Sequence, residues 1–223
     1  RCGAGCAAHC KAVGAGVSKV PPKLRAGIAA VLIAGGGGAA HTYIDRNTSE
    51  LLRHEYVQAV ARDVYTSEAV KVAMVMGAYY ESSYKHIGKP YVDRLGKGQP
   101  LTVCNGITGK DVVAEKSYTP RDCYLLERRV YLANEFTLIG DLPRWGDMTA
   151  FQQATFIDFL HNKGEGAWST STMRRRVLAG DVVGACRQNL RWNRGTINGV
   201  STVLPGLNVR AGANAELCEK GLT

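Results

Sequence analysis

Three side chains between residues 81 and 102 are of the types, and in the order, that cleavage of a sugar chain requires. Glu81 ends an apolar run, Asp93 lies in the Gly- and Lys-rich stretch that follows, and Thr102 lies on the next predicted strand. Breaking a glycosidic bond needs a proton for the leaving oxygen and stabilisation of an oxocarbenium-like centre, usually from two carboxyl groups on opposite sides of the bond. These residues therefore predict a site that cleaves glycosidic bonds.

Each of the three has an expected role. We expect Glu81 to be the general acid, because apolar neighbours such as Tyr79 and Tyr80 would desolvate its carboxyl group and keep it protonated near neutral pH. Asp93, in a polar loop, is expected to stay ionised, and the Thr102 hydroxyl is expected to hold a water molecule or one face of the sugar. A loop-capping carboxylate at Asp93 and an ordinary strand residue at Thr102 are the alternatives.

Hydrophobic periodicity predicts the elements that hold these residues. Thr48, Ser49 and Glu50 precede one amphipathic helix that continues to about residue 65, and a second helix, capped near Ser67, carries Glu81 in its last turn. Residues 85–109 are rich in Gly and Pro and predict a small, irregular hairpin sheet. Further helices are predicted to begin at Thr119, with Pro at the first position, and to cover residues 149–162, 171–179, 181–188 and 211–220.

The composition describes a globular protein with a strong positive charge. The chain has 223 residues, of which 45% are hydrophobic, and its 28 Lys and Arg against 19 Asp and Glu give a net charge of +9. Such a charge favours a polyanionic partner: nucleic acid, an anionic membrane surface or an anionic cell wall. The sequence has no phosphate-binding loop, zinc-finger spacing or RNA-binding aromatic motif, so we do not expect nucleic acid, and no metal or organic cofactor is implied.

Residues 26–44 form an uncharged stretch that is long enough to cross a membrane but only weakly apolar. Four consecutive glycines, Gly35 to Gly38, each cost about 1 kcal/mol relative to Ala in a helix. Three basic residues precede the stretch and Asp45 follows it, so the positive-inside rule predicts a cytoplasmic N-terminus and an exported main body. A cleaved signal peptide with its site at residues 39–41, or a Gly/Ala-rich linker, are the alternatives.

The seven cysteines fall into two groups. Cys2, Cys6 and Cys10 would line one face of a helix, which is a weak metal-binding signal without histidine support; alternatively, residues 1–16 are untranslated and the protein starts at Val17. Four others lie in the main body, and they predict disulfides if that body is exported or buried thiols if it is not: Cys104, Cys123, Cys186 and Cys218.

The order Glu81, Asp93, Thr102 resembles the catalytic motif of the phage T4-type lysozymes, glycoside hydrolase family 24. Further segments resemble the family's helical lobe, and together they extend the likeness over about residues 67–222: 148–153, 156–160, 162–166, 171–174, 179–181, 191–193, 204–207 and Arg210. Eleven residues separate Glu81 from Asp93 and eight separate Asp93 from Thr102, about three more in each case than in the family's motif. The family's pair of arginines near the C-terminus is reduced to Arg210.

The resemblance implies an α+β, lysozyme-like fold with a small β-hairpin subdomain beside a mainly helical lobe, preceded by a single membrane helix. It implies a muramidase that hydrolyses the β-1,4 bond between N-acetylmuramic acid and N-acetylglucosamine in peptidoglycan and lyses the host cell. A lytic transglycosylase acting on the same bond, and a non-catalytic peptidoglycan-binding protein, are the alternatives. A monomer without metal or cofactor is expected.

The weak membrane segment is similar to that of the signal-arrest-release (SAR) endolysins, a phage subclass. This likeness implies a basic cytoplasmic segment at 1–25, a releasable membrane segment at 26–44, a connecting helix at 45–66 and the catalytic domain at 67–223. It also implies the host inner membrane and secretion machinery as partners, a functional link to a phage holin or pinholin, and release to the periplasm. For an exported lysin we pair Cys186 with Cys218, and Cys104 with Cys123; a changed pairing at Cys104, two residues after Thr102, would hold the site inactive.

Overall fold

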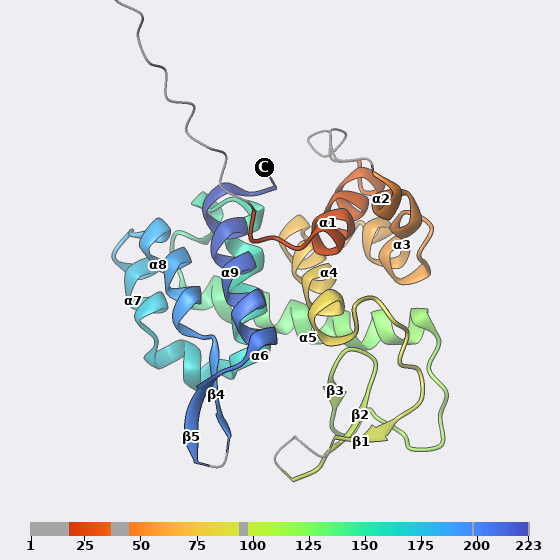
Figure 1. Cartoon of the computed structure of the whole chain (residues 1–223). Coiled ribbons are helices and arrows are strands. Elements are labelled where there is room, and N and C mark those ends of the chain that lie inside the picture. Colours follow the sequence, from red (N-terminus) through yellow and green to blue (C-terminus); the bar gives the residue numbers. More distant parts are fainter. Residues whose placement is uncertain (1–17, 37–44, 94–97, 198, 223) are drawn as a thin grey trace, which may run out of the picture.

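The chain folds into two lobes joined by one long helix. The computed structural model describes residues 18–36, 45–93, 98–197 and 199–222. Figure 1 shows α5 (Pro120–Asp141) running behind the molecule from one lobe to the other. Thr119 caps α5 in a reciprocal capping box with Asp122, and Pro120 occupies its first turn, as the sequence predicts.

Within the described residues, the N-terminal lobe combines four helices with a three-stranded antiparallel sheet. Its helices are α1 (Pro22–Ala34), α2 (Arg46–Leu51), α3 (Glu55–Arg62) and α4 (Glu68–Ser82). Its strands lie in the order β1 (Tyr91–Val92), β2 (Leu101–Val103), β3 (Ile107–Thr108). The short strands confirm the irregular sheet predicted for residues 85–109.

The C-terminal lobe is mainly helical and carries one two-stranded hairpin (Figure 1). It consists of α6 (Ala150–Thr170), α7 (Thr172–Leu178), α8 (Val182–Gln188), β4 (Arg194–Ile197), β5 (Val200–Val203) and α9 (Pro205–Lys220), with short 3-10 turns at Trp145–Asp147 and Asn189–Arg191. The disulfide Cys186–Cys218 joins α8 to α9, with 5.4 Å between the two Cα atoms. Two lobes, a small sheet and a mostly helical half confirm the lysozyme-like architecture expected from the sequence.

Three predicted boundaries are wrong. The single helix expected to reach residue 65 is two helices, because the Asp45 carboxylate caps α2 at the Thr48 N–H (2.7 Å) and the chain turns at Leu52 before His54 starts α3. The helix predicted for residues 149–162 extends to Thr170, because α6 resumes after a kink at Gly164, whose φ is 79°. α9 starts at Pro205, six residues before the predicted start, and the β4–β5 hairpin was not predicted.

α1 lies inside the protein core. Leu24, Ile28 and Val31 are almost completely buried, and the helix packs against α2, α3 and α4. Among the described residues, none of the helices combines the length and the apolar character needed to span a lipid bilayer. Residues 37–44 of the predicted membrane segment, and the three N-terminal cysteines, lie outside the described residues.

Candidate active site

Glu81 lies in the last turn of α4 and forms an ion pair across the molecule. The helix begins at Ser67, whose hydroxyl accepts from the Val70 N–H, and ends at Ser82; Ser83, with a left-handed φ of 53°, turns the chain toward the sheet. Arg210 of α9 donates from Nη1 to Glu81 Oε1 at 2.9 Å. The Glu81 side chain remains 38% exposed, so its carboxylate is held in place while it stays accessible to a substrate.

Arg210 is itself fixed by a buried hydrogen-bond network. Asp158 of α6 accepts from Arg210 Nε (3.0 Å) and Nη2 (2.7 Å), a two-pronged geometry that orients the guanidinium. Asn214 donates to the same carboxylate at 2.7 Å and accepts from the Tyr80 hydroxyl, also at 2.7 Å. Burial opposes the charged form of Arg210, but the neighbouring Asp158 and Glu81 carboxylates raise its pKa, so it carries a permanent charge.

The surroundings expected for Glu81 are wrong in one respect. The sequence suggested a desolvated carboxyl group among apolar residues, whereas the group is partly exposed and contacts a guanidinium. Tyr80 turns away toward Asn214, and the Arg210 guanidinium lies over its ring, 4.7 Å from the centroid. Arg210 determines the environment of Glu81, and it lies 129 positions later in the chain, so the local sequence around Glu81 does not reveal it.

Asp93 directly follows β1, and Thr102 lies on the adjacent strand β2. Tyr91 pairs with Thr102 across the β1–β2 ladder, and the Asp93 N–H donates to the Pro100 carbonyl at 3.0 Å. Partial burial, followed by the charges of Asp93 and Glu81, raises the pKa of the Tyr91 phenol. The charges of both predicted carboxylates therefore act in the same direction on this phenol.

Thr102 is more enclosed than its predicted role suggests. It is 2% exposed, and its hydroxyl donates to the Pro100 carbonyl at 3.2 Å. The hydroxyl thereby holds the end of the β1–β2 loop, and its own lone pairs accept no hydrogen bond from the described residues. The intervening residues 94–97 lie outside the described residues.

Glu127 is a buried carboxylate that the sequence reasoning missed. It is 1% exposed and accepts from the Tyr56 hydroxyl, the Asn105 N–H (3.1 Å) and the Asn105 side-chain amide (3.0 Å). Burial, reinforced by the charge of Glu81, raises the pKa of the Glu127 carboxyl to about 7, although its hydrogen bonds act in the opposite direction. It shares the buried face of α5 with Tyr131 and Leu138, and that helical spacing was a readable signal in the sequence.

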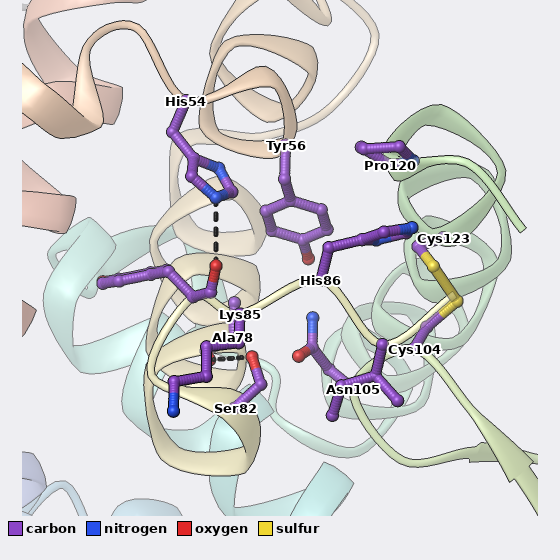
Figure 2. A pocket seen from close by; sticks show the side chains of 12 residues that line it. His54, Tyr56, Ala78, Ser82, Lys85, His86, Cys104, Asn105, Pro120 and Cys123 are labelled. Carbon is purple, nitrogen blue, oxygen red and sulfur yellow. Dashed lines mark hydrogen bonds between the residues drawn. A yellow bond between two sulfur atoms is a disulfide. The ribbon is translucent and has the colours of Figure 1, made fainter. Parts of the chain in front are cut away.

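The Cys104–Cys123 disulfide fixes the turn after β2, which also carries Asn105. Cys104, with a φ of 57°, follows β2 directly and is bonded to Cys123 of α5, with 5.4 Å between the Cα atoms. Figure 2 shows this bond, Asn105 and Tyr56 around a small cavity of about 20 Å³, enough for one water molecule. Together with Glu127 the two sulfurs form the one potential metal-ligand cluster within the described residues, but oxidised cysteines offer no thiolate.

α1 contacts the chain directly after Glu81. Lys23 Nζ donates to the Ser83 carbonyl at 3.0 Å, and the Tyr84 ring lies against Gly27. A Cβ atom at Gly27 would come within 1.9 Å of the Tyr84 hydroxyl oxygen, so glycine is required for this contact. The position of α1 is thereby coupled to the end of α4 that carries Glu81.

Comparison with known proteins identifies the family. The phage lysozyme family model matches residues 86–214, more than half of the chain. The chain belongs to the phage lysozyme family. A relative within it, the SAR-endolysin of Escherichia phage Mu, is 30% identical over 177 residues, which cover 78% of this chain and 80% of that protein. The SAR-endolysin of bacteriophage PS119 is 35% identical over 108 residues, 47% of this chain and 59% of its own length.

Solved structures of this family's fold are similar in three dimensions. The active form of the P1 phage endolysin Lyz has a TM-score of 0.58 at 19% identity, covering 75% of this chain and 93% of that one. The muramidase domain of SpmX from Asticaccaulis excentricus has a TM-score of 0.57 at 21% identity, covering 70% and 97%. At these identities the likeness establishes a lysozyme-like fold. The chain spans just over half the length of several curated relatives that it matches.

Proposed function

We propose that this phage lysozyme is an endolysin of the SAR type that hydrolyses the β-1,4 bond between N-acetylmuramic acid and N-acetylglucosamine in peptidoglycan. The main observation in support is the accessible Glu81 carboxylate at the end of α4, held by the buried Arg210. Family membership and the names of the relatives favour the same activity.

In the proposed reaction Glu81, in its protonated form, donates a proton to the leaving glycosidic oxygen. Asp93 acts on the opposite side of the bond, where a carboxylate stabilises the developing positive charge or activates the attacking water. Arg210 orients Glu81, because Asp158 occupies the Nε–Nη2 edge of the guanidinium and leaves Nη1 for the proposed catalytic carboxyl group. Thr102 is a positioning residue in this proposal, because its enclosed hydroxyl donates to the Pro100 carbonyl and holds the end of the loop that follows Asp93.

The test replaces Glu81 by Gln in the full chain and follows digestion of purified sacculi. We expect digestion to fall by at least about a thousandfold with an unchanged fold, because the proton donor is lost while the shape is kept. Glu115→Gln, an exposed loop carboxylate, is the matched control. Sacculus digestion by the Glu81 variant at the rate of the wild type would refute the assignment.

The two alternatives give different results. A lytic transglycosylase needs no catalytic aspartate and releases an anhydro sugar, so it would survive Asp93→Ala and yield a product one water lighter by mass spectrometry. A non-catalytic wall-binding protein would leave the glycan intact in every variant. Our proposal requires hydrated products and loss of activity in the Asp93 variant.

We also propose that residues 26–44 insert weakly in the host inner membrane and are later released to the periplasm, with the N-terminus cytoplasmic before release. The host secretion machinery would export the chain, a phage holin or pinholin would trigger release, and the enzyme would then act as a monomer. The name SAR-endolysin among the relatives supports this, as does the glycine-rich character of the segment. The packing of α1 beside the end of α4 is the arrangement that we assign to the released enzyme.

Expression of the full chain in a Gram-negative host tests the membrane proposal. Lysis on addition of an uncoupler, without loss of mass, is the expected result. Rapid conversion to a smaller protein would contradict it and would favour a cleaved signal peptide.

A further inference from the structure

A wide groove lies between α3 and the N-terminal half of α5, apart from the proposed active site. Its volume is about 600 Å³, which is within the usual range of ligand sites. It shares no lining residue with the set around Arg210 and Asp158. Figure 1 shows α3 above this half of α5, on the side of the N-terminal lobe away from the C-terminal lobe.

A rigid loop presents an exposed tyrosine at this groove. Tyr65 is 85% exposed, and its neighbour Val64 is 82% exposed. The loop is built on Asp63, whose carboxylate accepts from the Tyr65 N–H (2.8 Å), the Thr66 hydroxyl (2.6 Å) and the Tyr124 hydroxyl. These hydrogen bonds hold the backbone at Tyr65, and its exposed ring has only two side-chain torsions to immobilise, so the residue is suited to stacking on an apolar sugar face.

The charges that remain available in the groove are of both signs. Arg128 also donates to Asp63, so those two charges compensate each other. Although burial opposes it, these hydrogen bonds lower the pKa of Asp63, which therefore stays ionised and paired. Arg62, Arg121 and Glu55 also line the groove, and they form no ion pair or hydrogen bond with any residue that the structure describes.

A ligand for this groove should combine carboxylates, an ammonium group and a sugar. Arginine recognises carboxylates through its planar fork of donors, and Glu55 can receive an ammonium group. Cell-wall stem peptides carry free carboxylates and a free amino group, and they are attached to the sugar chain. An anionic membrane offers no sugar ring for Tyr65 and therefore matches the groove less well.

We propose that the groove between α3 and α5 binds the stem peptide of a second peptidoglycan strand while the proposed active site at Glu81 holds the strand to be cut. The inference rests on the proposed function, since it assigns a second site for the same polymer. Arg62 and Arg121 bind the peptide carboxylates, Glu55 binds its ammonium group, and Tyr65 packs on the adjoining sugar. The site increases retention on the wall and takes no part in the chemistry.

The test measures binding of the full chain carrying Glu81→Gln to insoluble sacculi by sedimentation. We expect Arg62→Gln combined with Arg121→Gln to weaken binding about tenfold, from the loss of two partly exposed charge-assisted contacts. The control, Arg46→Gln with Arg53→Gln, removes the same charge from exposed positions outside the groove and should change binding less than twofold. Sacculi stripped of peptides by an amidase should bind both double variants equally.

Glu55→Gln separates stem-peptide recognition from simple attraction to a polyanion. The proposal expects weaker binding to intact sacculi, since the partner of the ammonium group is lost, whereas attraction to a polyanion alone would strengthen. Unchanged binding of the Arg62 and Arg121 variant, an equal loss on stripped sacculi, or the same loss on vesicles containing phosphatidylglycerol would each overturn the proposal. Dissolution of the sacculi by the Glu81→Gln protein would instead disprove the catalytic assignment, and the double variants would then be compared on ice, before digestion proceeds.

Discussion

The buried carboxyl group of Glu127 should make the stability of the protein depend on pH in an unusual direction. Burial raises its pKa from 4.5 to about 7, so the folded protein binds a proton that the unfolded chain releases. The resulting stabilisation is fully present below pH 4.5 and is lost as the pH rises toward 7. A difference of about 2.5 pKa units corresponds to about 3 kcal/mol, with a maximum slope of about 1.4 kcal/mol per pH unit.

Glu127→Gln should remove this dependence because the amide stays neutral. Its oxygen can accept from the Asn105 N–H and side chain in place of Oε1, and its NH₂ group can donate to the Tyr56 oxygen. The assay is urea unfolding at pH 5, 6, 7 and 8 with both disulfides intact. Between pH 5 and 7 the unfolding free energy of the wild type should fall relative to that of the variant by about 2 to 3 kcal/mol.

The control is Glu115→Gln, which alters an exposed carboxylate and should leave the pH dependence of the wild type unchanged. Parallel curves for the wild type and the Glu127 variant would refute the reasoning. That result would mean that the carboxylate and its hydrogen bonds compensate the cost of burial completely.

Three further changes test the contacts around the site. Arg210→Ala should lower the unfolding free energy, measured in urea, by about 3 to 5 kcal/mol, because it leaves two carboxylates without their cation. Arg210→Lys should recover part of this stability but little of the lysis rate, because an ammonium group lacks the planar fork of donors. Full recovery of the lysis rate would contradict the role of the fork in orienting Glu81. Gly27→Leu should slow digestion of sacculi and lower the thermal midpoint, since its side chain collides with Tyr84, whereas Gly140→Ala, where a Cβ meets no atom within 4 Å, should do neither. Cys104→Ser should lower the unfolding free energy by about 3 kcal/mol, because it removes a crosslink between residues 19 positions apart. If the variant lyses the host at the same time as the wild type, the hypothesis that Cys104 keeps the protein inactive before release is wrong.

Local patterns in the sequence predicted the elements that carry the site. The caps at Ser67 and Thr119 begin α4 and α5, and the end of α4 falls directly after Glu81, as predicted. These features depend on residues within a few positions of one another, so the sequence displays them directly. The hairpin after Arg194 had a comparable signal in the pair Asn198 and Gly199, which favours a tight turn between two strands.

Local patterns did not predict the contacts between residues that are distant in the sequence. The pairing of Glu81 with Arg210 depends on how α4 and α9 meet, and the resemblance drew attention to the arginine without its partner. The same limit applies to α1, since an uncharged stretch of glycine, alanine and isoleucine fits both a lipid bilayer and a protein interior. Periodicity alone cannot distinguish these environments when every face of the helix is apolar.

The burial of α1 has a consequence for anyone who prepares the enzyme. Residues 26–34 look dispensable in the sequence, and a shortened chain that starts after them is the obvious way to obtain a soluble protein. Such a truncation would uncover the faces of α3 and α4 that Leu24, Ile28 and Val31 cover, each side chain worth about 1.5 to 3 kcal/mol of burial. The shortened protein would therefore expose an apolar surface next to the proposed active site. Low activity of that protein would result from lost packing and would not test the proposed chemistry.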